Sequence, residues 1–435
     1  MAFYKRTIRD YDLHGKTVLL RTDYNVPVEK GTITDDYRIK QSLPTVHYIL
    51  EQGARLIIVS HLGRPTGPND KGNSLRPVAA RLSQLLDKKV EFASDCIGQE
   101  VEMLAHKLEP GQVLMLENLR FHPKEEKDDP EFAKKLVEST GAEVFVQDGF
   151  GVVHRAHAST DAIARLLPAL AGFLLEKEVD TITRVMEDPA RPLTAVIGGA
   201  KISDKIDILN RLIDMADTVA VAGAMANNFL AAEGYKIGQS LVEKDAISTA
   251  KKILLKARKA EKIRNFNFLI PVDGVVSTKI DGTKPTRLVD LSSNSLADIE
   301  AYPKKPDHKS YTVATNELIL DIGPMSAYQI AGAVRMAQTI IWNGTCGVTE
   351  TRGIGGAEAP FAHGTKIVVE AMLGVSNHHQ NKPFTLVGGG DTVGYVEQEG
   401  LVEDFGHVST GGGASLELMS GHKLPGVEVL WNKDG

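Results

Sequence analysis

The chain is poor in cysteine, with only Cys96 and Cys346 among its 435 residues. The two cysteines lie far apart, and neither has a second cysteine at C-x-x-C spacing. This pattern argues against a disulfide framework and against a zinc site. It is typical of proteins that work in a reducing compartment.

The chain also lacks a long hydrophobic run. No apolar stretch approaches the roughly 18 residues that a membrane-spanning helix needs. The N-terminal residues Met-Ala-Phe-Tyr-Lys-Arg contain no apolar region of the kind that a signal peptide has. We therefore expect a cytoplasmic protein with no membrane partner.

A general excess of positive charge is absent as well, because the formal net charge is −6 at pH 7. The sequence therefore predicts no nucleic-acid partner, and any cationic site must be local. The hydrophobic content of 42% and the charged content of 24% are those of a globular protein. A chain of this length exceeds one ordinary hydrophobic core, so two domains are expected.

Short repeats and low-complexity tracts are missing, and strand-like and helix-like patterns alternate instead. Such alternation predicts an α/β fold with parallel sheets and helices on both of their faces. The expected strands cover residues 17–20, 56–59, 113–116, 144–146, 194–197, 218–222, 268–271, 339–342 and 385–387. The expected helices include residues 77–86, 131–138 and 203–214.

A boundary between the two domains is expected near residues 173–192. Residues 173–186 have helical spacing, and Pro189 and Pro192 end that helix. A hinge helix that joins two α/β lobes is the favoured interpretation, and a surface helix inside one domain is the alternative. The predicted organisation is an N-terminal lobe at 1–172, the helix at 173–190, a C-terminal lobe at 191–405 and a final segment at 406–435.

Cationic side chains follow four strands of the first half, at the point where each strand ends. The sets are Arg21 with Asp23, Asn25 and Arg38; His61 with Arg64; Arg120; and His154 with Arg155 and His157. Ligands of open α/β sheets bind beyond the carboxyl ends of the strands. An ordinary surface cation explains any one set, but the recurrence of four sets favours an anion site made of side chains.

Glycines follow the strands of the second half instead. Gly198 and Gly199 stand before Lys201 and Lys205, which are four residues apart. We therefore expect both lysines on one face of the helix that follows, where they would form an anion site at its N-terminus. The alternative is a solvated pair of lysines beside a glycine turn.

Two further glycine-rich turns occur near the end of the chain. Asp391 and Thr392 follow Gly388, Gly389 and Gly390 directly. Mg²⁺ commonly uses one or two carboxylates together with substrate phosphates, so Asp391 is a candidate metal ligand. The alternative is an N-cap role for Asp391 or Thr392.

The second of these turns contains Gly411 and Gly412. It leads into a helix start with room for a phosphoryl group.

The common nucleotide-binding motifs do not fit. Gly15-Lys16-Thr17 ends like a Walker A loop, but residue 10 is Asp and the motif precedes a strand. In a dinucleotide fingerprint starting at Gly388, the third glycine would fall at Val393. Asp404 is the nearest acidic residue, and it lies in a loop-like segment. A nicotinamide-dependent dehydrogenase is therefore a weak alternative.

No Ser-His-Asp or Cys-His arrangement stands out, and His61, His154 and His157 are more typical of structural or substrate-contacting histidines than of catalytic bases. The residues suit phosphoryl transfer, in which a protein mainly positions groups and neutralises charge.

Eight motifs, in order, resemble those of the phosphoglycerate kinase family over nearly the whole chain. They are residues 21–27, 60–65, 117–121, 154–160, 198–205, 342–344, 388–392 and 407–417. The resemblance implies two doubly wound, Rossmann-like lobes joined by a hinge helix. It implies a monomeric enzyme of glycolysis that transfers a phosphoryl group reversibly between 1,3-bisphosphoglycerate and Mg-ADP, giving 3-phosphoglycerate and Mg-ATP.

The resemblance also assigns roles. The implied phosphoglycerate contacts are Asp23, Asn25, Arg38, His61, Arg64, Arg120 and Arg155. The implied nucleotide-side residues are Lys205, Asn343, Glu350, Gly389, Gly390, Asp391 and Thr392, with Asp391 as the Mg²⁺ ligand. The implied catalytic groups, which act on the transferring phosphoryl group after lobe closure, are Arg38, Lys201, Gly388, Gly411 and Gly412.

The sequence departs from the family pattern mainly on the nucleotide side. The departures are Ala224-Met-Ala-Asn-Asn-Phe229, Trp342-Asn-Gly-Thr-Cys-Gly347, Asp321-Ile-Gly-Pro-Met325 and a longer stretch between Glu350 and Phe361. On the substrate side they are Gly149, Val152 and Val153. A competing hypothesis is thus a non-catalytic homologue that binds phosphoglycerate but handles nucleotide poorly.

Overall fold

The computed structural model describes residues 3–67, 70–291, 312–353, 359–374 and 382–433. The chain folds into two compact units. The first unit comprises Met1–Arg184 and Gly413–Gly435, and the second comprises Val185–Gly412. The division falls within helix α5 (Phe173–Glu187). Among the described residues, no helix is both long enough and apolar enough to cross a bilayer.

The first unit is built around one sheet of six parallel strands. In spatial order the strands are β5 (Val90–Phe92), β6 (Val113–Met115), β4 (Arg55–Val59), β1 (Thr17–Arg21), β7 (Val144–Gln147) and β8 (Ala169–Ala171). Strands β1, β6 and β7 are buried along their whole length. A parallel sheet covered on both faces needs such uninterrupted apolar strands, which explains why short apolar runs predicted them.

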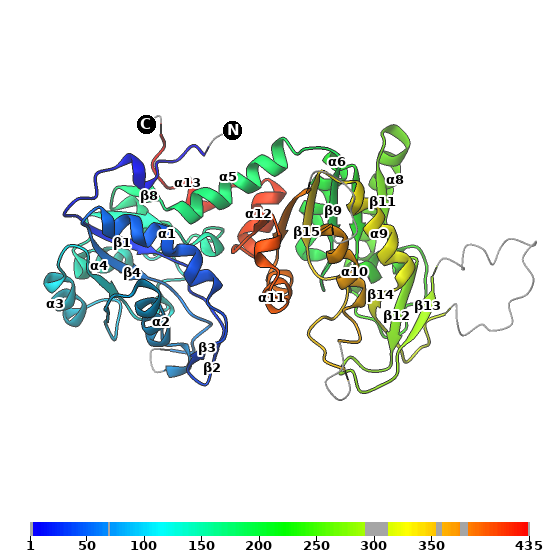
Figure 1. Cartoon of the computed structure of the whole chain (residues 1–435), viewed down its shortest axis with the longest axis horizontal. Helices are drawn as coiled ribbons and strands as arrows, with labels where there is room; N and C mark the ends of the chain where they lie inside the picture. Colours follow the sequence, from blue (N-terminus) through cyan, green and yellow to red (C-terminus); the bar gives the residue numbers. More distant parts are fainter. Residues whose placement is uncertain (1–2, 68–69, 292–311, 354–358, 375–381, 434–435) are drawn as a thin grey trace, which may run out of the picture. The chain divides into compact units, whose positions relative to one another are not determined.

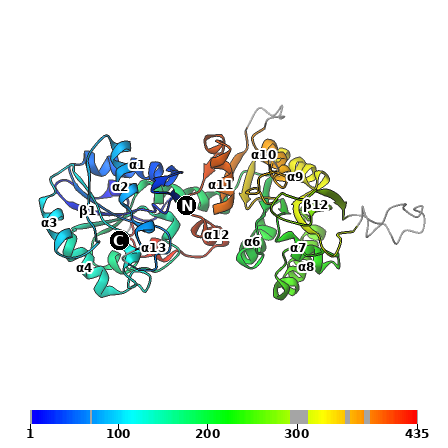
Figure 2. The same ribbon diagram turned by 90° about the horizontal axis from the view of Figure 1, so that it is seen from below.

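Helices cover both sides of this sheet. They are α1 (Tyr37–Glu51), α2 (Arg76–Leu86), α3 (Gln99–Lys107), α4 (Pro130–Thr140) and α5. In Figure 2, α1 and α2 lie on one side of the strands and α4 lies on the other. Helix α4 begins where the Asp129 side chain accepts a hydrogen bond from the N–H of Phe132, and it ends at Gly141 in the left-handed conformation. A two-stranded hairpin, β2 (Val28–Glu29) with β3 (Thr32–Ile33), precedes α1.

The C-terminal residues belong to the first unit. They form α12 (Gly413–Ser420) and the short α13 (Pro425–Glu428), and the chain then runs beside the N-terminal residues. The N–H of Arg6 donates to the carbonyl of Trp431 at 2.7 Å, and the N–H of Trp431 donates to the carbonyl of Ala169 at 3.0 Å. Residues near Arg6 and Trp431 therefore lie together beside β8, the last strand of the first sheet.

The second unit contains another sheet of six parallel strands. In spatial order these are β11 (Asn267–Leu269), β10 (Thr218–Val221), β9 (Leu193–Ile197), β15 (Thr339–Asn343), β16 (Phe384–Gly388) and β17 (His407–Val408). The helices of this unit are α6 (Ile206–Met215), α7 (Ala226–Ala232), α8 (Ile247–Ile263), α9 (Pro324–Met336), α10 (His363–Met372) and α11 (Gly390–Gln398). Figure 1 shows these elements in green to orange.

A three-stranded antiparallel sheet in the second unit has no counterpart in the sequence prediction. Its strands are β13 (Arg287–Asp290), β12 (Asp273–Ser277) and β14 (Leu318–Ile322). The sequence pattern predicted parallel sheets and gave no sign of this antiparallel one. Two doubly wound parallel sheets are otherwise as predicted, so the α/β fold class is confirmed.

Candidate functional site

The four cation-rich loops of the first unit lie together at the carboxyl ends of its strands, here called the cationic edge of the sheet. Strands β6, β4, β1 and β7 are neighbours, and all four run in the same direction. Their carboxyl ends are therefore adjacent, and the loops that follow them carry Arg120, His61, Asp23 and Arg155 respectively. The topology thus brings together side chains that are more than 130 residues apart in the sequence.

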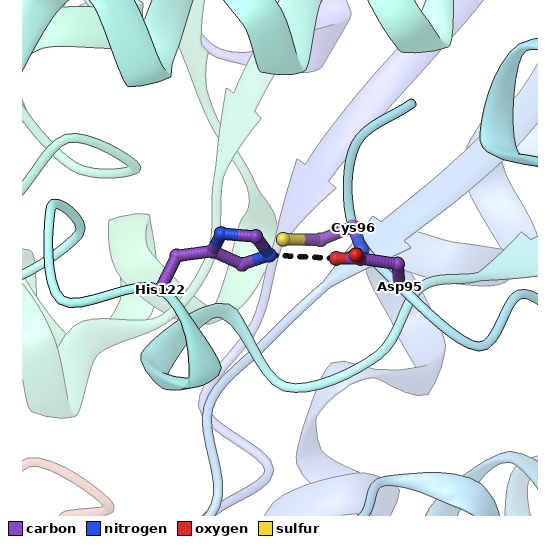
Figure 3. A group of neighbouring side chains, drawn as sticks. All are labelled: Asp95, Cys96 and His122. Atoms are coloured by element: carbon purple, nitrogen blue, oxygen red, sulfur yellow. Dashed lines mark hydrogen bonds and ion pairs between the residues drawn. The ribbon is translucent and has the colours of Figure 1, made fainter. Parts of the chain in front are cut away.

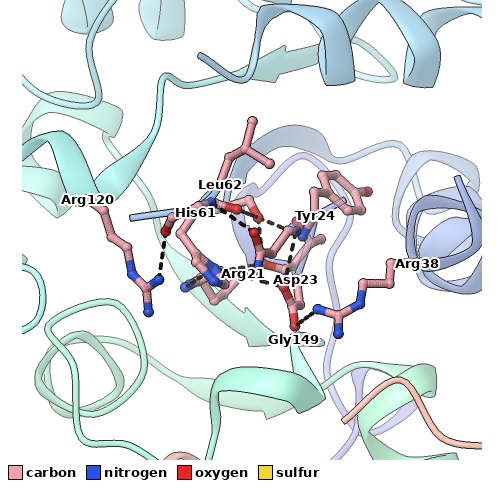
Figure 4. A network of polar contacts seen from close by, with 12 residues as sticks. Arg21, Asp23, Tyr24, Arg38, His61, Leu62, Arg120 and Gly149 are labelled. Carbon is pink, nitrogen blue, oxygen red and sulfur yellow. Dashed lines mark hydrogen bonds and ion pairs between the residues drawn. The ribbon is translucent and has the colours of Figure 1, made fainter. Parts of the chain in front are cut away.

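An ion pair between Arg38 and Asp23 lies at this edge (Figure 4). Nη1 of Arg38 is 2.6 Å from Oδ2 of Asp23, and Arg38 comes from the first turn of α1. Burial by itself would raise the pKa of Asp23, but the nearby positive charges, that of Arg38 first and that of Arg21 as well, outweigh it and lower that pKa. Asp23 is therefore an anion that fixes the direction of Arg38 and leaves its other N–H donors free for a ligand.

The histidines of this edge are neutral at pH 7. His61 is buried, and its pKa lies well below the ordinary value because of burial and of the nearby charges of Arg21, Arg120 and Arg38. Burial and the same kind of charges lower the pKa of His157 to about 4, and the pKa of His154 is lowered too. Nδ1 of His154 and Nδ1 of His157 are buried without a hydrogen-bond partner among the described residues. They can orient a ligand by hydrogen bonds without adding charge.

Arg120 and Asn25 hold the loop that follows β4. Nη1 of Arg120 donates to the carbonyl of Gly63 at 2.9 Å, and Oδ1 of Asn25 accepts from the N–H of the same glycine at 2.8 Å. Nε of Arg120 lies 3.0 Å from a carboxylate oxygen of Glu126. Arg64 and Arg155 are exposed.

Sequence reasoning missed the buried centre of this network. The side chain of Arg21 is fully buried; its Nε donates to Oγ of Ser159 at 2.8 Å, and its Nη1 donates to the carbonyl of Thr22. Glu125 accepts from the N–H and the hydroxyl of Ser159, at 3.0 and 2.5 Å. The strand position of Arg21 was visible in the sequence, but no local pattern links it to Glu125 and Ser159.

Gly149 packs directly against the loop that follows β1 (Figure 4). A Cβ atom at this position would lie 3.0 Å from the carbonyl carbon of Thr22 and 3.2 Å from the backbone nitrogen of Asp23. These distances are shorter than ordinary van der Waals contacts, so a larger residue would push the two backbones apart and glycine favours the close approach. This contact gives a physical reason for one of the unusual residues on the substrate side.

The second unit has a pocket of about 260 Å³ at the carboxyl edge of its sheet. Its walls include Gly199, Ala200, Asn227, Leu241, Glu350 and Asp391. Much of the apolar remainder of the lining comes from β14, and the rest includes Ala226, Leu230, Pro271, Ile280, Cys346 and Val348. The sequence prediction named Glu350 and Asp391, which lie on the pocket, but it did not find the apolar wall.

Lys205, Asn343 and Gly389 form a group beside this pocket. Nζ of Lys205 donates to Oδ1 of Asn343, and both side chains are buried. Nδ2 of Asn343 is buried with no hydrogen-bond partner among the described residues. A Cβ atom on Gly389 would lie 3.1 Å from Oδ1 of Asn343, so the glycine leaves this polar pair uncovered. The group presents N–H donors and a cation, as an anion site requires.

The expectation that Lys201 and Lys205 share one helix face is wrong. Residues Ser203–Lys205 form a single 3₁₀ turn, and α6 begins only at Ile206. Lys201 therefore lies in the loop before the helix and is exposed, whereas Lys205 turns inward to Asn343. The pair supplies one buried and one solvent-accessible cation rather than two equivalent ones.

The N-cap alternative for Asp391 and Thr392 is also wrong. Gly389 is the N-cap of α11, with φ of +95°, so Asp391 lies in the first helical turn and is exposed. Oγ1 of Thr392 accepts from the N–H of Gly344 at 2.6 Å and so fixes the turn that follows β15. Gly388 is the last residue of β16, and Gly390 is the first of α11.

Gly411 and Gly412 end the second unit and directly precede α12. Gly411 is buried and its N–H donates to Oγ of Ser409 at 3.1 Å, while Gly412 has a left-handed φ of +48°. This conformation favours glycine at position 412, although a Cβ there would meet no other atom within 4 Å.

Comparison with known protein families shows which family contains a chain with these two groups of residues. A family model described as phosphoglycerate kinase matches residues 8–422. The chain belongs to the phosphoglycerate kinase family. This match confirms the resemblance that the sequence motifs indicated, and with it an enzyme of the phosphotransferase class.

Members of the family resemble the chain over its whole length. A phosphoglycerate kinase of Moorella thermoacetica is 45% identical over 430 residues, which is 99% of this chain and 100% of that protein. One from Pelotomaculum thermopropionicum is 42% identical with the same coverage. The solved structure of phosphoglycerate kinase from Coxiella burnetii has a TM-score of 0.77 at 35% identity, and it covers 98% of both chains. The structure from Pyrococcus horikoshii has a TM-score of 0.81 at 29% identity, also with 98% coverage of both.

Two departures from the family pattern have a structural explanation. Nδ2 of Asn227 donates to the carbonyl of Leu241 at 3.0 Å, and Nδ2 of Asn228 donates to the carbonyl of Glu243 at 2.7 Å. Both amides therefore fasten the segment that follows α7 to the pocket wall. Cys346 is buried against Thr365, whose hydroxyl accepts its N–H at 3.0 Å. Residues 354–358 of the longer stretch before Phe361 lie outside the described residues.

We expect nucleotide binding to depend on the charge of Lys205. Burial lowers the pKa of Lys205 to about 8, although Asp204 and Asp391 oppose this shift. Below that pH the amine is charged and attracts a phosphate, and above it binding must first protonate the amine. The Kd of Mg-ADP should therefore rise about tenfold between pH 7 and pH 9. Titration calorimetry at both values measures the change.

The matched control for this pH effect is Lys205→Arg, whose guanidinium remains charged throughout this range. Its Kd should be nearly constant between pH 7 and pH 9. An equal rise in the wild type and in Lys205→Arg would show that another group causes the pH dependence.

Proposed function

We propose that the chain transfers a phosphoryl group between 1,3-bisphosphoglycerate and Mg-ADP, with 3-phosphoglycerate and Mg-ATP as products. The observation that carries a catalytic function is the intact group of Lys205 and Asn343 beside the exposed Asp391. A homologue that only senses phosphoglycerate would have no need to keep a buried lysine and an unpartnered amide next to a pocket, because both are costly without a ligand.

The cationic edge of the first unit is the proposed phosphoglycerate site. Asp23 directs Arg38, and Asn25 and Arg120 hold the loop that carries Arg64. Neutral His61 and the exposed Arg155 complete the set. Guanidinium groups suit this ligand because they bind phosphate and carboxylate oxygens through paired N–H donors.

The pocket of the second unit is the proposed site of the Mg-nucleotide. Its apolar wall suits a base, Glu350 is proposed to contact the ribose, and the donors near Lys205, Asn343 and Gly389 suit the phosphates. Gly390 and Thr392 shape the same turn.

The exposed carboxylate of Asp391 beside these donors fits Mg²⁺, which prefers oxygen ligands and shares its coordination with phosphates. When bound, the ion would neutralise negative charge on the nucleotide phosphates.

The transferring phosphoryl group carries negative charge on three oxygens. Arg38, Lys201 and the N–H groups of Gly388, Gly411 and Gly412 are proposed to neutralise that charge. For Gly411 this requires that its N–H exchange the bond to Oγ of Ser409 for one to the phosphoryl group. We further propose that the protein acts as a monomer in the cytoplasm, on small-molecule substrates alone.

A coupled assay of ATP-dependent phosphorylation of 3-phosphoglycerate tests this function. We expect turnover in the presence of Mg²⁺ by the wild type. Asp391→Ala should lose most of this turnover and bind Mg-ADP more weakly, while calorimetry shows unchanged binding of 3-phosphoglycerate. Binding of 3-phosphoglycerate by the wild type without any turnover would favour the non-catalytic alternative.

A further inference from the structure

Asp95, Cys96 and His122 form a cluster in the first unit that the proposed reaction does not use (Figure 3). One oxygen of Asp95, Sγ of Cys96 and a ring nitrogen of His122 all lie within 4.8 Å of one another. Nε2 of His122 is 2.6 Å from Oδ1 of Asp95. The first two residues follow β5, and His122 follows the short 3₁₀ helix η3 (Leu119–Phe121) after β6. The cluster therefore joins two separate loops.

Each of the three side chains is held in place. The N–H of Cys96 donates to Oδ1 of Asp95 at 2.6 Å, and the ring of His122 stacks on Phe132 with centroids 5.2 Å apart. Cys96 is fully buried, and Figure 3 shows its sulfur directed toward the imidazole. The side chains of His122 and Asp95 remain 27% and 49% exposed, so solvent reaches the cluster from their side.

We propose that Asp95, Cys96 and His122 bind one divalent ion of the zinc class. Sulfur, imidazole nitrogen and carboxylate oxygen are the donors that zinc uses, and a site with three protein ligands keeps a fourth position for water. Mg²⁺ takes oxygen ligands almost exclusively, so this site is chemically distinct from the nucleotide site. Sequence analysis argued against zinc because it looked for paired cysteines, and this cluster contains only one.

The ligand atoms must move to hold the ion, and those that are now up to 4.8 Å apart would approach by up to about 1.5 Å. Zinc–ligand distances of about 2.0–2.3 Å place the ligand atoms of a tetrahedral site about 3.3–3.7 Å apart. Asp95 and His122 would separate by less than about 1 Å, and the ion would replace their hydrogen bond. The thiol proton leaves to solvent as the sulfur binds the metal. The proton that Nε2 of His122 shares with Oδ1 of Asp95 passes to Nδ1 of the same ring or to solvent, so that Nε2 can bind the ion through its lone pair.

The ion would also act on the neighbouring phosphoglycerate edge. His122 is the C-cap of η3, and Arg120 lies within that turn. Arg120 donates to the carbonyl of Gly63 at 2.9 Å, so a shift of His122 toward Cys96 displaces an arginine of the proposed substrate site. We expect bound zinc to weaken the binding of 3-phosphoglycerate about fivefold or more. This consequence rests on the proposed function, whereas the metal site itself does not.

The metal site is tested by titrating the chelator-treated full-length protein with Zn²⁺ and, separately, with Co²⁺. Calorimetry should give one zinc ion bound at least about tenfold more tightly by the wild type than by Cys96→Ala or His122→Gln. The Co²⁺ form should show a sulfur-to-cobalt charge-transfer band that Cys96→Ala lacks. His106→Gln, which removes an exposed histidine of α3, is the matched control and should bind like the wild type.

Circular dichroism verifies that each variant is folded. If Cys96→Ala does not fold, His122→Gln still tests the site. Equal zinc binding by the wild type and the folded variants, or a cobalt spectrum without the sulfur band, would overturn the site.

Binding of 3-phosphoglycerate is then measured without nucleotide, because nucleotide phosphates also bind zinc. An affinity that zinc leaves unchanged would overturn the coupling to Arg120. No binding of 3-phosphoglycerate even without zinc would contradict the proposed function instead.

Discussion

Replacing Arg38 with alanine is expected to lower kcat by about 10²- to 10³-fold, the range seen when one preorganised donor to a developing charge is lost. Only one N–H of Arg38 is directed to Asp23, at 2.6 Å, and the side chain remains 29% exposed. The other donors can therefore follow negative charge as it moves onto the transferring phosphoryl group. Steady-state kinetics gives kcat, and calorimetry gives the Kd of Mg-ADP, which should change less than about twofold because Arg38 belongs to the other unit.

Two variants sharpen this prediction. Arg38→Lys keeps the charge but loses the planar set of donors, so it should recover only part of kcat. Lys40→Ala removes a cation of the same helix that pairs with Asp36 at 2.8 Å on the surface, and its kcat should stay close to that of the wild type. Equal losses in kcat and in Mg-ADP affinity for Arg38→Ala would contradict a role in transfer.

The sequence alone predicted the fold class correctly, because a strand buried on both faces leaves a local pattern, a short run of apolar residues. An apolar run such as residues 56–59 can be buried only as a strand covered on both faces, and it became β4. The same logic failed for β12 and β14. Their pairing is antiparallel and joins residues more than 40 positions apart, and no turn signal between them reveals it.

The candidate site could be predicted only in part for a related reason. Asp23, His61 and Arg120 were recognisable because each follows a strand end. The partners that decide their chemistry come from elsewhere in the chain: Nη2 of Arg21 contacts His61 from 40 positions away, and Arg120 donates to Gly63, 57 positions away. The sequence spacing also predicted Lys201 on the same helix face as Lys205, which is wrong because a 3₁₀ turn at Ser203–Lys205 precedes α6. Contacts of this kind depend on tertiary packing and leave no local pattern.

The largest expected loss of stability comes from Arg21. Its buried guanidinium faces buried Glu125 and Asp23, and it donates to Ser159 and Thr22. Arg21→Met fills a similar volume but leaves Ser159 and Thr22 without their donor and buried Glu125 without its main cation, whereas Asp23 keeps its ion pair with Arg38. Loss of one partner of a buried charge network costs about 3–5 kcal/mol. We expect the free energy of unfolding of the first unit to fall by that amount at pH 7.

The tryptophans provide the measurement. Trp431 belongs to the first unit and Trp342 to the second, and the chain has no others. Urea unfolding followed by fluorescence in a Trp342→Phe background therefore reports the first unit alone. Arg165→Met is the matched control, because Arg165 pairs with Asp161 at 2.9 Å but is 66% exposed, and its loss should cost less than about 1 kcal/mol.

The pH dependence of the stability of Arg21→Met tests whether Glu125 is the group that loses its cation. Burial already raises the pKa of Glu125, and Arg21 opposes that shift. Without Arg21 the pKa in the folded state rises further above that of the unfolded chain, so the folded variant binds a proton that the unfolded chain releases. The variant should then lose stability relative to the wild type as the pH rises from about 5 to 7. Adding Glu125→Gln should remove this pH dependence and restore part of the stability. A deficit that does not change with pH or with Glu125→Gln would instead assign the loss to the hydrogen bonds of Ser159 and Thr22.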